Sequence, residues 1–303
     1  MKKIIIFIFC GLVFAGCKQD PIIENEDNQQ IVVFFSSNSI LTSKVKSAAT
    51  PTEGIINKVV LFGFDATNNF VPDSKWIIGN PDLVAGEELI LKRKVKTIWA
   101  IANPTTAMEN LNPANVAALT TQTASYPANG RPASPFLMSG KGTVNSYSAN
   151  IKLFFAVAKV EIIPTGFNIS AVEVQNTLNQ VFVFDDNLFN GTPLLTPVVP
   201  SGSGVSRVTY TSPTPLPQPL VFYVAENNAT STANSTKFVV NGSIDGVAIV
   251  PYTIELKMNN QIIPIKRNTR YTVTISPVSQ SMGNVTVSIP EWEDGDNDDQ
   301  VFK

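Results

Sequence analysis

The sequence predicts an all-β protein built as β-sandwiches, and three observations lead to that fold class. Almost every apolar segment after residue 30 is short and rich in Val, Ile and Phe. Each segment is bounded by Gly, Pro, Asn or Asp, the residue types that end strands. Residues 271–275 and 285–289 alternate apolar and polar side chains, which is the period of a half-buried strand. Many short strands with turn residues between them are typical of β-sandwiches.

The first thirty residues predict a leader and a tether. Lys2 and Lys3 precede an apolar run over residues 4–14, which is about half of the ~20 residues that span a bilayer. Residues 1–16 are therefore predicted to be a signal peptide. The ending Phe14-Ala-Gly-Cys17 resembles a bacterial lipobox, which implies cleavage before Cys17 and lipidation of that residue. An ordinary signal peptide cut elsewhere is the alternative. The polar, acidic residues 17–30 predict a flexible tether.

The strands of the body follow one another along the chain. The first apolar run has no polar interruption, so we expect a strand covered on both faces, and residues 59–64 are similar. The members of the first run are Ile31, Val32, Val33, Phe34 and Phe35. Further strands are expected at residues 96–101, 151–163, 171–174, 181–184, 220–224, 238–240 and 252–256.

One helical stretch and one proline-rich stretch interrupt the strands. Asn112 as N-cap and Pro113 at the first helical position predict a single short helix over residues 112–119. Residues 193–219 hold seven prolines, which predicts a long surface loop and excludes a central strand. The strand-rich halves divide near Pro164, so we expect an N-terminal β-sandwich over residues 31–163 and a C-terminal one over residues 164–303.

Composition argues against an enzyme and against nucleic acid as a partner. Twenty-two Lys and Arg residues stand against 24 Asp and Glu residues, for a net charge of −2, and nucleic acid requires a basic face. The chain has no histidine, and both of its cysteines lie within the first seventeen residues. The usual nucleophile systems and Cys- or His-bound metals are thereby excluded. No cofactor or metal is expected, since an acidic run over residues 294–298 lacks the Gly and Glu of a calcium loop.

The three tryptophans leave a second function class open. Trp99 sits within an apolar strand and is expected in the core. Trp76 and Trp292 lie at predicted strand or loop edges, where an indole can stack on a sugar ring. The alternative function is therefore a glycan-binding cell-surface lipoprotein.

Five short motifs occur in a fixed order behind the lipobox. They are TIWAIAN at residues 97–103, FLMSG at 136–140, IKLFFAVAKVEI at 151–162, RNTRY at 267–271 and VSIPEW at 287–292. In this order and spacing the chain resembles the fimbrillin family, the subunits of type V pili, from about Ile31 onward.

The resemblance implies an architecture and a route of assembly. It implies two tandem transthyretin-like β-sandwich domains, with the predicted short helix in the first. It further implies an outer-membrane lipoprotein at the cell surface, which becomes part of a fimbrium, binds other pilus subunits and supports adhesion to a host or bacterial receptor. A maturation protease removes the first strand, here residues 31–35, and a donor strand from another subunit replaces it. Lys44 and Lys46 are the processing candidates, and Val285, Val287 and Ile289 mark the candidate donor strand.

The residues themselves agree with such an exchange. Burying five large apolar side chains contributes on the order of ten kcal/mol as an upper bound. Loss of that strand would leave an apolar slot and unpaired backbone groups, which must be paired again by another strand.

Overall fold

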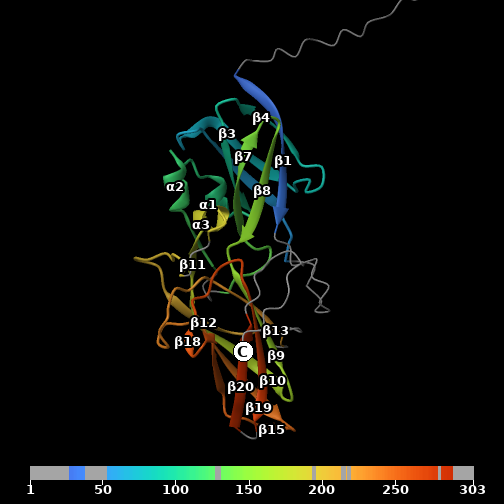
Figure 1. The fold of residues 1–303 in the computed structure, drawn as a ribbon, viewed down its shortest axis with the longest axis vertical. Helices are drawn as coiled ribbons and strands as arrows, with labels where there is room; N and C mark the ends of the chain where they lie inside the picture. Colours follow the sequence, from blue (N-terminus) through green and yellow to red (C-terminus); the bar gives the residue numbers. More distant parts are fainter. Residues whose placement is uncertain are drawn as a thin grey trace, which may run out of the picture.

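The computed structural model describes residues 27–37, 53–126, 131–192, 196–212, 216, 220–278 and 281–288. Strands dominate these residues, and the predicted all-β fold class is confirmed. Figure 1 shows an elongated molecule, with one large sheet towards one end and two smaller sheets towards the other.

The large sheet has seven strands and curls on itself. Its strands lie in the order β3-β2-β5-β7-β8-β1-β4. An ion pair joins its two outermost strands, with 2.9 Å between Lys92 Nζ and Asp73 Oδ2. The bounds are β1 (Asn28–Ser37), β2 (Lys58–Phe64), β3 (Phe70–Gly79), β4 (Glu87–Lys92), β5 (Thr97–Ala102), β7 (Met138–Asn145) and β8 (Ser148–Phe155).

The central strands β2 and β5 are buried on both faces, as their unbroken apolar sequences predict. Inside the curl, Leu61 and Ile98 join the main core of the sheet. On the outside, Phe62 and Trp99 belong to a second core. Short elements cover that outer core: α1 (Thr106–Glu109), α2 (Val116–Thr120), α3 (Asp186–Phe189), and β6 (Thr123–Ser125) paired with β11 (Gln180–Phe182).

Two smaller sheets face each other across a third core. One has the order β13-β9-β19-β20, and in the other β10 lies between β12 and β14. Phe222 and Val273 from the first sheet meet Val174 and Phe238 from the second. The bounds are β9 (Ala158–Pro164), β10 (Asn168–Leu178), β12 (Arg207–Thr211), β13 (Leu220–Val224), β14 (Lys237–Ile244), β15 (Val247–Ala248), β16 (Tyr252–Glu255), β19 (Arg270–Val278) and β20 (Ser281–Ser288). The strands β17 (Lys257–Met258) and β18 (Gln261–Ile262) pair as a separate hairpin.

The prediction of one short helix over residues 112–119 was wrong in its start and in the number of helices. The helix α2 begins at Val116, because Asn115 is its N-cap and accepts a hydrogen bond from the amide of Ala118. A second helix, α1, precedes it, with Thr105 as N-cap. A third, α3, starts from Asp185 and packs onto the outer core through Phe189.

The stretch over residues 151–163 is two strands and not one. The chain leaves the seven-stranded sheet after Phe155 and enters the four-stranded sheet at Ala158. The expected division near Pro164 thus coincides with the end of β9, within the smaller sheets. The division into two domains stays a prediction. The proline-rich stretch contains β12, which lies at the edge of its sheet, where proline-rich flanks are tolerated.

None of the helices in the described part of the chain has the length and apolar character needed to cross a bilayer.

Candidate functional site

The first strand lies in the interior of the seven-stranded sheet. β1 runs parallel to β8 on one side and antiparallel to β4 on the other. Val33 is in register with Ala149 of β8 and with Glu87 of β4. Figure 1 shows β1 alongside β8. Removing β1 would therefore separate two strands that it now joins.

The inward face of β1 is fully apolar. Ile31, Val33 and Phe35 are buried in the main core, with exposures of 1%, 0% and 6%. They pack with Ile151 of β8 and Leu89 of β4 in the same core. Three side chains of this size contribute roughly 5–9 kcal/mol as an upper bound. This inward face is the source of the affinity for β1.

The expectation that β1 is covered on both faces was wrong. Val32 is half-buried and Phe34 is 37% exposed. Side chains alternate along a strand, so the two residues point outward. Among the described residues no helix covers them as α1 to α3 cover β2, and the loop before β4 approaches them at Gly86. The apolar run thus reports a buried inward face and a half-covered outward face.

The strand β4 depends on β1 for its place in the sheet. Within the described part of the chain, β4 pairs with no strand other than β1. The side chain of Gln30 adds a hydrogen bond of 3.1 Å to Glu88 on the outward face. Any strand that takes the place of β1 must therefore hold β4 as well as β8.

The chain returns from the first strand into a buried anchor. Glu53 is buried, and its carboxylate oxygens lie 3.0 and 3.2 Å from Lys159 Nζ. The hydroxyl of Tyr223 also donates to Glu53. Lys159 and Tyr223 are opposite one another on β9 and β13. The segment before β2 is thereby fixed to the smaller sheets, independently of β1.

A second buried ion pair joins the smaller sheets to the outer core. The guanidinium of Arg267 lies 2.5 Å from Glu226 and donates to the carbonyls of Phe182 and Val183. Burial opposes the charge on Arg267, but Glu226, with smaller effects of Asp185 and Tyr126, favours it, and the pKa of Arg267 is raised. Next to it, Asn268 accepts a hydrogen bond from the amide of Phe155, the last residue of β8. The RNTRY motif therefore forms part of the joint between the sheets.

The candidate donor strand is paired within its own sheet. Val285 and Val287 lie on β20, opposite Ile275 and Val273 of β19. In the described part of the chain, β20 is the last strand of its sheet, so one strand alone holds it. An edge strand with one neighbour can leave its sheet at the lowest cost in backbone hydrogen bonds.

Of the remaining predicted site residues, only Trp76 lies within the part of the chain that the structure describes. Trp76 lies on the edge strand β3, half-buried against the main core. Its role as a sugar platform stays a prediction. Cys17, Lys44, Lys46, Ile289 and Trp292 lie outside the described residues, as does the acidic run over residues 294–298.

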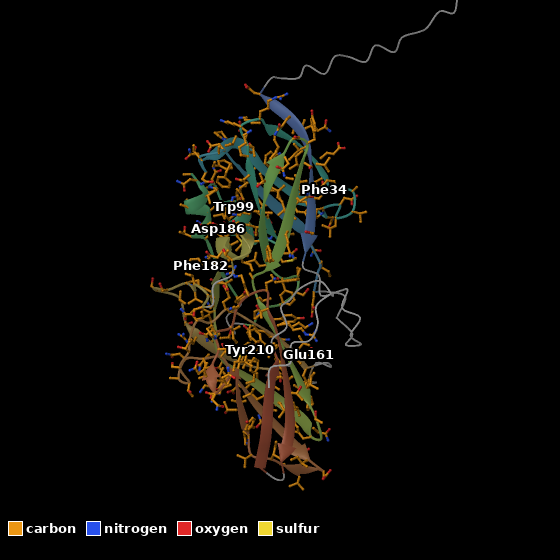
Figure 2. All side chains as sticks on the ribbon, in the orientation of Figure 1. Phe34, Trp99, Glu161, Phe182, Asp186 and Tyr210 are labelled. Atoms are coloured by element: carbon orange, nitrogen blue, oxygen red, sulfur yellow. The ribbon has the colours of Figure 1, made fainter. Side chains whose placement is uncertain are left out.

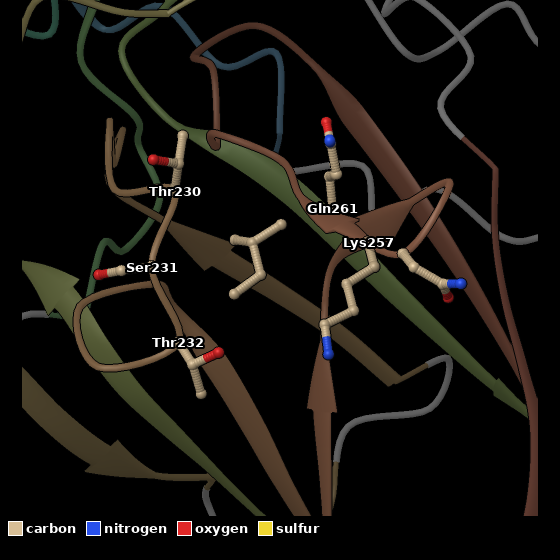
Figure 3. A pocket seen from close by; sticks show the side chains of 7 residues that line it. Thr230, Ser231, Thr232, Lys257 and Gln261 are labelled. Carbon is tan, nitrogen blue, oxygen red and sulfur yellow. The ribbon is translucent and has the colours of Figure 1, made fainter.

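A polar depression of about 510 Å³ lies beside β17 and β18, whereas Trp76 lies on β3 of the large sheet. Figure 3 shows the hydroxyl residues Thr230, Ser231 and Thr232 on one wall, facing Lys257 and Gln261 on the other. The Lys257 ammonium is already paired with Glu255 at 2.7 Å. The described residues that line the depression include no aromatic ring. The depression and Trp76 do not form one site.

Sequence reasoning missed the ion pairs Glu53–Lys159 and Glu226–Arg267, because the partners are far apart in the chain. Glu53 and Lys159 are separated by 106 positions, and no local pattern marks such a pair. Among the described residues, no group of three or more Asp, Glu, Cys or His side chains is placed to hold a metal ion.

The comparisons with known proteins bear on this geometry. The family model for the major fimbrial subunit protein (FimA) matches residues 41–178. The resemblance to the fimbrillin family is confirmed. No curated protein sequence matches the chain significantly.

Solved structures with the same fold include several fimbrial proteins. The tip fimbrial protein Mfa3 from Porphyromonas gingivalis has a TM-score of 0.59 and 14% identity, over 88% of this chain and 100% of that one. A fimbrial assembly protein from Parabacteroides distasonis has a TM-score of 0.55 and 16% identity, over 91% of this chain and 100% of that one. A fimbrilin from Porphyromonas gingivalis has a TM-score of 0.53 and 12% identity, over 88% of this chain and 98% of that one. At such low identities, these likenesses establish the shared fimbrillin-like fold over most of the chain.

Proposed function

We propose that this chain is a subunit of a surface fimbrium, in a stalk, tip or accessory position, that supports adhesion. It is exported as a lipoprotein through Cys17 and reaches the cell surface at the outer membrane. A protease cuts at Lys44 or Lys46, the first strand leaves, and a strand from another subunit takes its place. The observation that carries this proposal is the interior position of β1 between β8 and β4.

The position of β1 supports an exchange for a physical reason. Departure of β1 would leave β8 and β4 with unpaired backbone groups facing each other. It would also open an apolar slot where Ile31, Val33 and Phe35 now lie. Exposed strand edges and apolar surface of this kind are stabilised by an added strand. The vacated sheet is therefore an acceptor for a partner strand.

The anchoring of Glu53 supports a cut upstream of it. Residues 38–52 link β1 to Glu53, and both processing candidates lie within that stretch. After a cut there, Glu53 would remain held by Lys159 and Tyr223, so the fragment containing β1 would leave while the rest of the sheet kept its place. The strand with Val285, Val287 and Ile289 is the proposed donor for a neighbouring subunit.

Limited trypsin digestion of the mature chain tests the proposal, with native mass spectrometry as the readout. We expect a cut at Lys44 or Lys46, release of the β1 fragment and growth of SDS-resistant oligomers. A chain in which both lysines are replaced by Gln is the control and should stay intact and monomeric. A cut chain that keeps its β1 fragment and stays a monomer would contradict the exchange. A cut chain that loses β1 and binds a donor peptide, but does not polymerise, would indicate a tip or accessory position.

A further inference from the structure

The outward face of β1 meets a notch in the loop before β4. Gly86 is the residue before β4, and the β1–β4 register pairs Val33 with Glu87. The next position along brings Gly86 beside Phe34. A Cβ atom placed on Gly86 would lie 2.8 Å from Cγ1 of Val32 and 2.9 Å from Cδ1 of Phe34. The two outward side chains thus occupy the space that a side chain at position 86 would need.

Three hydrogen bonds to Asp82 close the turn that ends at Gly86. Asp82 Oδ1 accepts hydrogen bonds from the amides of Val84 and Ala85, at 2.8 and 2.7 Å. The carbonyl of Asp82 accepts from the amide of Gly86 at 3.1 Å. The turn closes with a φ of +80° at Gly86, a conformation that glycine adopts without steric cost. This turn places the backbone of Gly86 directly against the outward side chains of β1.

Phe34 gains from this notch although it points out of the sheet. It is 37% exposed, so close to two thirds of its surface is covered. Figure 2 labels it on β1, on the side of the large sheet away from Trp99. An aromatic ring across from a glycine compensates for the missing side chain in a cross-strand pair. The contact with Gly86 therefore involves both outward side chains of β1, Val32 and Phe34, and Phe34 supplies its aromatic part.

We propose that the slot of β1 recognises its strand on both faces, and that Gly86 selects a large, flat apolar side chain at the position of Phe34. This inference rests on the proposed strand exchange. The inward face accepts any alternating apolar strand, whereas the outward notch distinguishes between such strands. The predicted donor strand of this chain has Thr286 and Ser288 between its apolar positions. A strand from a different subunit, with an aromatic residue beside Gly86, is therefore the preferred occupant. The donor strand of a second copy still enters through its apolar face, but binds less tightly.

Peptide exchange into the trypsin-cut mature chain tests the selection. The probes are a labelled peptide of residues 28–37, the same peptide with Phe34→Ser, and a control peptide with Gln30→Ser, which changes an outward position away from Gly86. We expect Phe34→Ser to weaken binding roughly 5- to 30-fold and Gln30→Ser to change it by less than about threefold. In the Gly86→Ala chain, the first peptide should lose its advantage over Phe34→Ser.

The Gly86→Ala chain has a matched control in Gly246→Ala. Gly246 has a φ of +79° and no atom within 4 Å of an added Cβ, so its substitution introduces the same backbone strain and no clash. If the unchanged and the Phe34→Ser peptides bind equally to the wild-type and Gly246→Ala chains, the proposed selection by Gly86 is contradicted. A tail peptide of residues 283–291 that binds as tightly as residues 28–37 would overturn the preference for another subunit.

A measurement on the uncut chain separates this inference from the exchange itself. Urea unfolding of Gly86→Ala, Phe34→Ala and the double variant gives the coupling between the two positions. Strong coupling, with no peptide entering any cut chain, would show a contact within the fold and would overturn the exchange together with the selection. If the peptide binds the cut chain but positions 86 and 34 show no coupling energy, strand exchange is supported and the selection by Gly86 is contradicted.

Discussion

Lys159 Nζ lies 3.0 Å from Glu53 Oε1, and both side chains are at least 96% buried. The pair joins the segment that leads into β2 to the middle of β9, and the hydroxyl of Tyr223 donates to the same carboxylate. This buried ion pair thus connects the large sheet to the smaller sheets, in addition to the covalent chain. Two buried charges that neutralise each other are stable only as a pair.

Removing one partner of this pair should destabilise the protein strongly. We expect Glu53→Leu or Lys159→Met to lower the free energy of unfolding by ~3–5 kcal/mol, because the remaining group loses its partner in a buried site. The double variant Glu53→Leu with Lys159→Met should recover most of that loss. Urea unfolding of the four chains gives the coupling energy. Lys92→Met is the control, since its partner Asp73 is 85% exposed and such pairs contribute under ~1 kcal/mol.

Asn103 should be sensitive in two separable ways. Its side-chain amide donates to the carbonyls of Ile55 and Phe136, both at 2.8 Å, and its Oδ1 accepts from the amide of Asn57. Its φ is +54°, where non-glycine residues are strained. We expect Asn103→Gly to cost ~1–3 kcal/mol through lost hydrogen bonds, and Asn103→Ala to cost ~1 kcal/mol more through strain. Thermal and urea unfolding measure both; equal losses would contradict the strain.

Gly140 should not tolerate a side chain. A Cβ atom there would lie 2.0 Å from the carbonyl oxygen of Lys152 on the neighbouring strand β8. Gly140→Ala must push β7 and β8 apart, and we expect a loss of over ~2 kcal/mol. The strand β8 also pairs with β1. After cleavage at Lys44 or Lys46, the Gly140→Ala chain should therefore release the β1 fragment faster than the cleaved wild-type chain.

The matched control for that position is Gly79→Ala. Gly79 has no atom within 4 Å of an added Cβ and no positive φ. Its substitution should change the free energy of unfolding by no more than ~0.5 kcal/mol. A Gly140→Ala chain as stable as this control would show that β7 and β8 can shift without cost.

The strands were predictable because each one is a short apolar run, and the side chains of such a run are buried wherever it pairs. Residues 59–64 and 96–101 became β2 and β5, whose two covered faces explain why neither run alternates. The same pattern at residues 31–35 has another cause. Val32 and Phe34 are apolar although they face outward, and a loop that ends in Gly86 covers them in part. An unbroken run therefore indicates apolar contact on both faces, and leaves open whether a helix layer or a single loop supplies it.

The details that escaped prediction depend on choices between equivalent local signals or on distant partners. Asn112 and Asn115 are both good N-caps, and the structure uses Asn115, whose Oδ1 lies 2.9 Å from the amide of Ala118. The partners of Glu53 lie on β9 and β13, far along the chain, so only the fold brings them together. Gly86 likewise carries no signal of its own, since its meaning comes from the register between β1 and β4.

The turn that presents Gly86 should weaken in acid. Hydrogen bonds from the amides of Ala85 and Val84 to the Asp82 carboxylate lower the pKa of Asp82 below its ordinary value of 3.8. A carboxyl group with a lowered pKa in the folded state contributes stability above the unfolded value, and that contribution disappears as the pH falls through the folded value. Asp82→Asn removes the charge while its amide oxygen can still accept the hydrogen bonds. We expect wild type to exceed Asp82→Asn in free energy of unfolding at about pH 7, and the difference to shrink steadily below pH 3.8. Urea unfolding of both chains across that range measures it, and a difference that stays constant down to about pH 2 would show that the charge does not stabilise the turn.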